Sequence, residues 1–222
     1  MTPTGAAPAA AVARVARVLA GAGLVGAFGH VSARAVGGDG FLLTSTDPLA
    51  SHAEASVHLL DVAGAPVSAG DNGGVPLEAP LHAAIYAARA DVGAICRTHS
   101  PAAVVWGVRA TVPPLLHGLG GLAGNVVSWT ADDDLVTTTA AAQEAAAALG
   151  TADCLLIRAN GSVVTGATLE QATVRAWFLE ERARVALEAG PDAVVPTGVD
   201  ARSRHHAAEE ARAWRWLEET WA

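Results

Sequence analysis

Short apolar runs alternate along this chain with longer segments of helical periodicity, and the alternation restricts the fold to a sheet covered by helices. Runs such as HVSAR, FLLTST and GAICRTHS are bounded by glycine, aspartate or proline and have the pattern of strands. Segments such as AAVARVARVLAGAGL and TLEQATVRAWFLEERARVALEAG repeat apolar residues every three or four positions, as helices do. Because no internal repeat or domain-scale linker interrupts this order, we predict one domain over residues 1–222, of α/β or α+β class, in which helices cover a β-sheet.

Three local signals place elements in the second half of the chain. Asn160-Gly161 lies between two apolar runs and predicts a β-hairpin. Asp132 to Asp134 are predicted to form the acidic first turn of an alanine-rich helix that Gly150 ends. Thr168 is predicted to cap the next helix, which Gly190 stops.

The basic residues exclude several kinds of enzyme. All 14 residues of the Lys+Arg count are arginines, so the chain contains no lysine. A Schiff-base enzyme and a pyridoxal phosphate enzyme each need a lysine amine, and a Walker A loop needs its lysine beside the phosphates. The terminal amine aside, none of these three mechanisms is open to the protein.

Charge and hydropathy favour a small-molecule partner. The formal net charge is −8 and the arginines are dispersed, so we expect no nucleic-acid partner. No stretch approaches the roughly 20 apolar residues that span a bilayer, and we predict a cytoplasmic protein without a membrane partner. Cys96 and Cys154 lie in apolar runs without C-x-x-C spacing, which favours a buried reduced pair over a disulfide.

Two candidate binding turns lie in the first third of the chain. His30 and Ser32 follow Gly29 at the start of a strand, and Ser45 lies at the end of FLLTST. Hydroxyls and backbone N–H groups at such turns can hold a phosphate or a carboxylate. Ordinary turn chemistry is the commoner explanation of the same residues.

Two further places carry groups suited to proton transfer. Glu78 and His82 are four residues apart and share one helical face, which suits a proton-transfer pair, half of a metal site or a plain surface pair. Arg97 and His99 share one face at the end of a buried strand. An arginine that emerges from such a strand requires a polar partner, so this place has the strongest functional signal.

Taken in order, these motifs resemble those of the class II aldolase/adducin family. The resemblance rests on GHVSAR, on PLEAPLHAAIY followed by RADVGAICRTHS, and on LLIRANGSVVTGATLEQA, and it runs from about residue 10 to about residue 190. In that family the two histidines of an H-x-H motif and a histidine of a later turn hold a divalent ion, usually zinc. A helix glutamate acts as acid/base, and the metal polarises the substrate carbonyl.

This sequence departs from the family pattern at two of the three ligand positions. Arg97 stands at the first position of H-x-H and Asn160 stands at the later turn, so His99 is the one surviving ligand. A guanidinium stays protonated and has no lone pair for a metal. We therefore expect no resident metal. A rearranged Zn or Mn site built on His99, His82 and Glu78, with His30 or His117 as a further ligand, stays open as an alternative.

The resemblance and the departure together suggest how catalysis works. Arg97 is predicted to replace the metal as the fixed positive charge, and Asn160 to donate a hydrogen bond to the same substrate oxygen. Glu78 is predicted to carry the proton, with a raised pKa if its pocket is apolar, and His99 to donate or relay a proton. We count these four as catalytic, and we predict that His30, Ser32, Ser45, His82 and His117 bind substrate, with His117 at the centre of the apolar loop VPPLLHGLGGLAG.

We accordingly predict a carbon–carbon lyase, either a decarboxylase or an aldolase-like enzyme that forms an enolate from a small carboxylic or oxo acid. The alternatives are a metal-dependent class II aldolase or decarboxylase with rearranged ligands, and a non-catalytic adducin-like binding or assembly domain. The family resemblance implies a homotetramer with its site at a subunit boundary. Trp214, Trp216 and Trp221 do not fit one narrow helical stripe, so we expect one of them to face a neighbour or another part of the chain.

Overall fold

The protein is built on one eight-stranded mixed sheet. A computed structural model describes residues 9–35, 37–68, 73–131, 134–199 and 206–222. The strand order is β4-β3-β2-β1-β5-β8-β7-β6, and every neighbouring pair is antiparallel except β6 with β7. The strands are β1 (His30–Arg34), β2 (Phe41–Thr44), β3 (Val57–Leu60), β4 (Pro66–Ser68), β5 (Ala94–Thr98), β6 (Val126–Trp129), β7 (Cys154–Ile157) and β8 (Ser162–Gly166).

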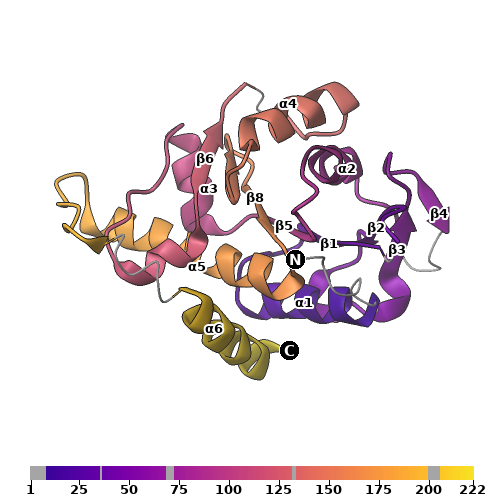
Figure 1. The fold of residues 1–222 in the computed structure, drawn as a ribbon, viewed down its shortest axis with the longest axis horizontal. Coiled ribbons are helices and arrows are strands. Elements are labelled where there is room, and N and C mark those ends of the chain that lie inside the picture. Colours follow the sequence, from indigo (N-terminus) through magenta and orange to yellow (C-terminus); the bar gives the residue numbers. More distant parts are fainter. Residues whose placement is uncertain (1–8, 36, 69–72, 132–133, 200–205) are drawn as a thin grey trace.

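Helices cover both faces of this sheet, as the sequence predicts. Helices α2 and α4 lie over one face, and α1 and α5 lie over the other, with α6 packed outside them (Figure 1). The helices are α1 (Ala9–Gly21), α2 (Ala79–Ala88), α3 (Pro101–Val108), α4 (Thr139–Leu149), α5 (Leu169–Ala189) and α6 (His206–Trp221), and the short 3₁₀ turns are η1 (Leu49–Ser51), η2 (Glu54–Ser56) and η3 (Gly118–Ala123).

The alternation of side chains along β5 divides the core into two layers. Cys96 packs in the layer formed with α1 and α5, whereas Ile95 packs in the layer formed with α2 and α4. Successive residues of a strand point to opposite faces, so Arg97 points to the same side as Ile95. A charged side chain therefore enters the layer beneath α2.

Strand β1 repeats this arrangement beside β5. Val31 belongs to the α1 and α5 layer, so His30 and Ser32 point to the α2 layer. The antiparallel register pairs His30 directly with Arg97. Cross-strand partners have Cβ atoms about 5 Å apart, and the pairing thus brings an imidazole and a guanidinium together under α2.

Most of the local signals are confirmed, and one helix start is wrong. The predicted hairpin is formed by β7 and β8, and the Thr168 side chain caps α5 by accepting a hydrogen bond from the Gln171 N–H. Helix α4 begins at Thr139 and not at the aspartates, because the Thr138 side chain caps it by accepting from the Ala141 N–H. Asp134 precedes this cap, while the predicted positions 132 and 133 lie outside the described residues. A hydroxyl that bonds a free helix N–H determines the start more strongly than acidic residues near it.

The remaining sequence expectations concern cysteines, membranes and tryptophans. Cys96 and Cys154 are both buried and free, which confirms the reduced pair. Within the described part of the chain, no helix has the length and apolar character needed to cross a membrane. Trp216 makes edge-on ring contacts with Trp177 of α5 and with Trp221, so the last helix uses its tryptophans partly against the chain itself.

Candidate active site

The centre of the candidate site is a buried ion pair between Glu78 and Arg97. Glu78 lies immediately before α2 and is 5% exposed, and Arg97 at the end of β5 is 0% exposed. Arg97 Nη2 donates to Glu78 Oε1 at 3.2 Å, and Arg97 Nε lies 3.1 Å from Oε2. The third nitrogen, Nη1, donates to the Thr98 carbonyl at 3.1 Å. The guanidinium thus makes one hydrogen bond to Oε1 and an ion-pair contact with Oε2.

A line of hydrogen bonds extends from Glu78 into the protein beneath α2. His30 Nε2 lies 3.3 Å from Glu78 Oε2, and His30 Nδ1 lies 2.7 Å from His82 Nε2. His82 Nδ1 lies 2.7 Å from Ser32 Oγ, which lies 2.8 Å from the Tyr86 hydroxyl. The predicted pair of Glu78 and His82 is therefore not in direct contact, because the His30 ring lies between them.

Electrostatics make Glu78 a carboxylate. Burial is the largest single influence on its pKa and raises it, but the hydrogen bond from His30 and the charge of Arg97 act in the opposite direction. The pKa of Glu78 is lowered as a result. The condition for a raised pKa, an apolar pocket, is not met, because the pocket around this carboxyl is polar, with a third donor in the Val136 N–H at 3.4 Å from Oε1.

The histidines of the site are neutral near pH 7. Burial lowers the pKa values of His30 and His82, and for His82 the neighbouring His30 lowers it further. Burial, followed by the charge of Arg97, lowers the pKa of His99 to about 4. Among the residues that the structure describes, Arg97 is therefore the one permanent cation that touches Glu78.

The hairpin between β7 and β8 brings Asn160 to the same place. Asn160 raises the pKa of His99 slightly against the larger effects of burial and Arg97, which places its side chain beside that imidazole, and both residues are half-buried. Gly161 follows with φ of +76°, and a Cβ there would lie 2.9 Å from Arg97 Nη1 and 3.1 Å from His99 Cδ2. Glycine at this position lets the turn approach both side chains. The four residues predicted to be catalytic, Glu78, Arg97, His99 and Asn160, thus lie together.

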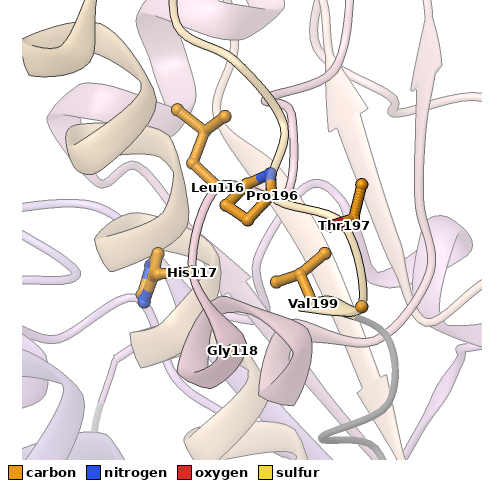
Figure 2. Close-up of a pocket in the computed structure, with 7 residues that line it drawn as sticks. Leu116, His117, Gly118, Pro196, Thr197 and Val199 are labelled. Carbon is orange, nitrogen blue, oxygen red and sulfur yellow. The ribbon is translucent and has the colours of Figure 1, made fainter.

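The residues predicted to bind substrate divide into three groups. His30 lies in the site, while Ser32 and His82 lie behind it and are completely buried. Ser45 lies in the turn after β2, where its Oγ accepts from the Asp47 N–H at 3.2 Å. His117 precedes η3 and lines a separate pocket of about 270 Å³, to one side of Leu116, Pro196 and Val199 (Figure 2). Among the described contacts, none joins Ser45 or His117 to Glu78.

Comparison with known proteins identifies the family. The family described as Class II Aldolase and Adducin N-terminal domain matches residues 10–187. The chain belongs to the class II aldolase and adducin family. Two curated relatives, from Arthrobacter keyseri and from Terrabacter sp. (strain DBF63), are named 3,4-dihydroxyphthalate decarboxylase. Each is 30% identical to this chain, over 192 and 189 residues, which is 80% of this chain and 77% and 79% of the relatives.

Solved structures of the same family share the fold. The aldolase II superfamily protein from Pseudomonas syringae has a TM-score of 0.80 and 20% identity over 95% of this chain and 90% of its own. The L-fuculose 1-phosphate aldolase from Glaciozyma antarctica PI12 also has a TM-score of 0.80, at 16% identity over 96% of this chain and 88% of its own. Together with the decarboxylase relatives, the family makes this class II aldolase homologue a lyase.

The residues at the positions where the resemblance implies metal ligands do not fit a divalent ion. Arg97, where the resemblance implies the first ligand, directs its nitrogens to Glu78 and to the Thr98 carbonyl. A guanidinium has no lone pair to donate, and an amide at Asn160 is a poor substitute for an imidazole on zinc. Elsewhere in the described part of the chain, no group of three or more His, Cys, Asp or Glu side chains is arranged to hold a metal.

Sequence reasoning missed two contributors to the site. Tyr86 ends the buried line of hydrogen bonds, and its position four residues after His82 on a helix is the signal that points to it. Val136 donates its backbone N–H to Glu78 from a segment that is 58 residues away in the chain, and no sequence pattern marks such a contact.

Proposed function

We propose that this protein is a decarboxylase that cleaves a carbon–carbon bond of a small hydroxylated carboxylic acid and uses Arg97 as its fixed positive charge in place of the family's metal. One observation carries the proposal. The guanidinium of Arg97 is completely buried, at the strand end where relatives place a metal ligand, and it lies against the carboxylate of Glu78. A permanent organic cation at that place suits the charge that develops on a substrate oxygen.

The substrate class is supported by the polar groups at the outer edge of the site. His99 and Asn160 are half-buried, whereas Glu78 and Arg97 are buried. Arg97 Nη1 carries a second N–H beyond its bond to Thr98, and it adjoins the Gly161 turn. An imidazole, an amide and this N–H together suit an acid that also carries a hydroxyl group. The curated relatives are named for a dihydroxylated aromatic dicarboxylic acid, and that class is the first to test.

The proposed reaction conserves protons and electrons. The carboxylate of Glu78 takes the proton of the substrate hydroxyl, and the resulting oxyanion is stabilised by Arg97 and Asn160. Glu78 then returns the proton to the ring or α-carbon that bears the leaving carboxylate. The bond from that carbon to the carboxylate breaks, its electron pair returns to the substrate, carbon dioxide leaves, and water supplies the proton that restores the hydroxyl. This sequence needs Glu78 to be unprotonated at rest, in agreement with its lowered pKa.

The test is carbon dioxide release from 3,4-dihydroxyphthalate by protein purified without a chelator. We expect wild-type turnover that a strong chelator does not diminish. Arg97→Met is expected to lower kcat by about 10²-fold or more, because one preorganised charge at an oxyanion is removed. Asn160→Ala, in a half-buried position, is expected to lower kcat less.

The matched control is Arg184→Met, which removes an exposed arginine paired with Glu188 and is expected to retain wild-type activity. Two results overturn the proposal. One is turnover that a chelator abolishes and a divalent ion restores. The other is an Arg97→Met variant that is folded and retains activity within about threefold of wild type.

We further propose that the protein works as a homo-oligomer. The first support is the resemblance to the class II aldolase/adducin family, which implies a homotetramer. Phe28, Leu77 and Leu135 are 77%, 72% and 45% exposed, and each lies within two residues of Glu78 or of a group that contacts it. Exposed apolar side chains beside a site are typical of a surface that another chain covers. Light scattering after size-exclusion chromatography tests this, and a monomer at micromolar concentration contradicts it.

A further inference from the structure

The line of hydrogen bonds behind Glu78 has one internally consistent direction. It connects Tyr86, Ser32, His82 and His30 to the Glu78 carboxylate, and all five side chains are buried. Each contact measures between 2.7 and 3.3 Å, so each needs one donor and one acceptor. Because a neutral imidazole has one N–H and one lone pair, the role of each nitrogen constrains the next group.

The direction follows from the carboxylate inwards. An ionised Glu78 only accepts, so His30 must donate from Nε2. The other nitrogen of His30, Nδ1, is then an acceptor, and His82 must donate to it from Nε2. His82 Nδ1 is then an acceptor, and its partner, the Ser32 hydroxyl, must be the donor.

The hydroxyl end completes the same order. Ser32 donates its O–H to His82 Nδ1, and its oxygen accepts the O–H of Tyr86. Burial, the largest cause, raises the pKa of Tyr86, which keeps that proton on the phenol. Every donor therefore points toward Glu78, and the opposite order fails because it would direct the Nε2 lone pair of His30 at a carboxylate.

We propose that Ser32, His82 and Tyr86 are positioning residues that lock His30 in its Nε2–H tautomer and hold that N–H against Glu78. This inference deepens the proposed function, because it rests on Glu78 as the proton acceptor of the reaction. The lock directs one oxygen of the carboxylate, Oε2, toward a fixed donor, while Oε1 is held by Arg97 and the Val136 N–H. The line ends at a phenol that retains its proton, so it orients Glu78 and does not deliver protons to it.

The first test reads the tautomer directly and needs no substrate. Nitrogen-15 NMR of the imidazoles at pH 7 distinguishes a protonated Nε2 from a protonated Nδ1. We expect both His30 and His82 to carry their proton on Nε2. A proton on Nδ1 of His30, or an imidazolium at either residue, overturns the inference.

The second test compares two substitutions of His82. His82→Gln retains an amide N–H that reaches toward His30 Nδ1, whereas His82→Leu fills the space without a donor. We expect His82→Leu to lower kcat by about tenfold with little change in KM. His82→Gln is expected to keep kcat within about threefold of wild type, because it retains the one hydrogen bond to His30 that the leucine variant loses. Equal kcat values for the two folded variants overturn the inference, and thermal unfolding establishes that both are folded.

The two proposals fail in distinguishable ways. If the protein releases no carbon dioxide from the tested acids but NMR finds both protons on Nε2, the decarboxylase assignment fails and the tautomer lock stands. If turnover depends on Arg97 while NMR finds a proton on His30 Nδ1, the lock fails and the proposed function stands. Tyr86→Phe, at the far end of the line, is expected to lower kcat less than His82→Leu, because Ser32 keeps its O–H for His82.

Discussion

Removal of the Arg97 charge is expected to destabilise the folded protein strongly. Arg97 is 0% exposed, and its Nε lies 3.1 Å from Glu78 Oε2. Two unit charges at 3.1 Å attract each other by roughly 5 kcal/mol at an effective dielectric constant of about 20. Because His30 and the Val136 N–H remain as donors to the carboxylate, we expect Arg97→Met to lower the free energy of unfolding by about 3 kcal/mol, the lower end for breaking a buried pair.

A double-mutant cycle separates the ion pair from the loss of packing. Glu78→Gln leaves a buried guanidinium without its counter-charge, so it is also expected to be destabilising. The double variant Arg97→Met with Glu78→Gln removes both charges, and its cost is expected to be smaller than the sum of the two single costs by about 2 kcal/mol or more. Urea unfolding followed by tryptophan fluorescence measures all four proteins, and Arg184→Met serves as the exposed control.

The loss of stability caused by Arg97→Met is expected to become smaller as the pH falls. The lowered pKa of Glu78 gives the wild type a contribution to stability that is present above the ordinary glutamate pKa and is lost as the pH falls. Without Arg97 that pKa rises, so the variant loses less on acidification and the difference between the proteins shrinks. An Arg97→Met cost below about 1 kcal/mol at pH 7, or additive costs in the cycle, refutes the reasoning.

Three further predictions concern the same layer of the protein. Arg97→His combined with Asn160→His restores the imidazoles of the family pattern, and we expect this variant to bind one divalent ion per chain by isothermal titration calorimetry, whereas either single variant binds weakly. Because the pKa values of His30 and His82 are lowered in the folded protein, the unfolded chain binds more protons below the ordinary histidine pKa. The free energy of unfolding is therefore expected to fall as the pH drops through about 6.5. His82→Gln is expected to reduce this dependence on pH, as measured by urea unfolding at a series of pH values. Gly161→Ala forces a Cβ into contact with Arg97 at a φ of +76°, and we expect a loss of more than about 1 kcal/mol in thermal unfolding, with Asn160→Ala as the milder neighbour.

Periodicity and turn chemistry allowed most elements to be predicted from the sequence. Helix α5 follows the three-to-four residue pattern up to Gly190, and the β7–β8 hairpin surrounds the Asn160-Gly161 turn. These signals are local, so they do not depend on contacts elsewhere in the chain. Strand β4 was not predicted, because a three-residue edge strand leaves too short a pattern to detect.

The sequence predicts which residues form the site better than it predicts which of them are in contact. Sequence motifs indicate all four predicted catalytic residues, and the structure brings them together: Glu78, Arg97, His99 and Asn160. The interposed His30 ring was not anticipated, because its place depends on the register between β1 and β5. Register is a relation between two segments that are far apart in the chain, and neither segment encodes it alone.

The order of helices and strands, the family motifs, and the arginine and asparagine at positions 97 and 160 are properties of the sequence itself. The ionisation of Glu78 depended on the tertiary structure. The sequence predicts a raised pKa only for an apolar pocket, whereas the folded protein surrounds that carboxyl with Arg97, His30 and a backbone N–H. A pKa reflects the sum of burial, charges and hydrogen bonds at one point in space, and only folding brings the groups that contribute to this sum together.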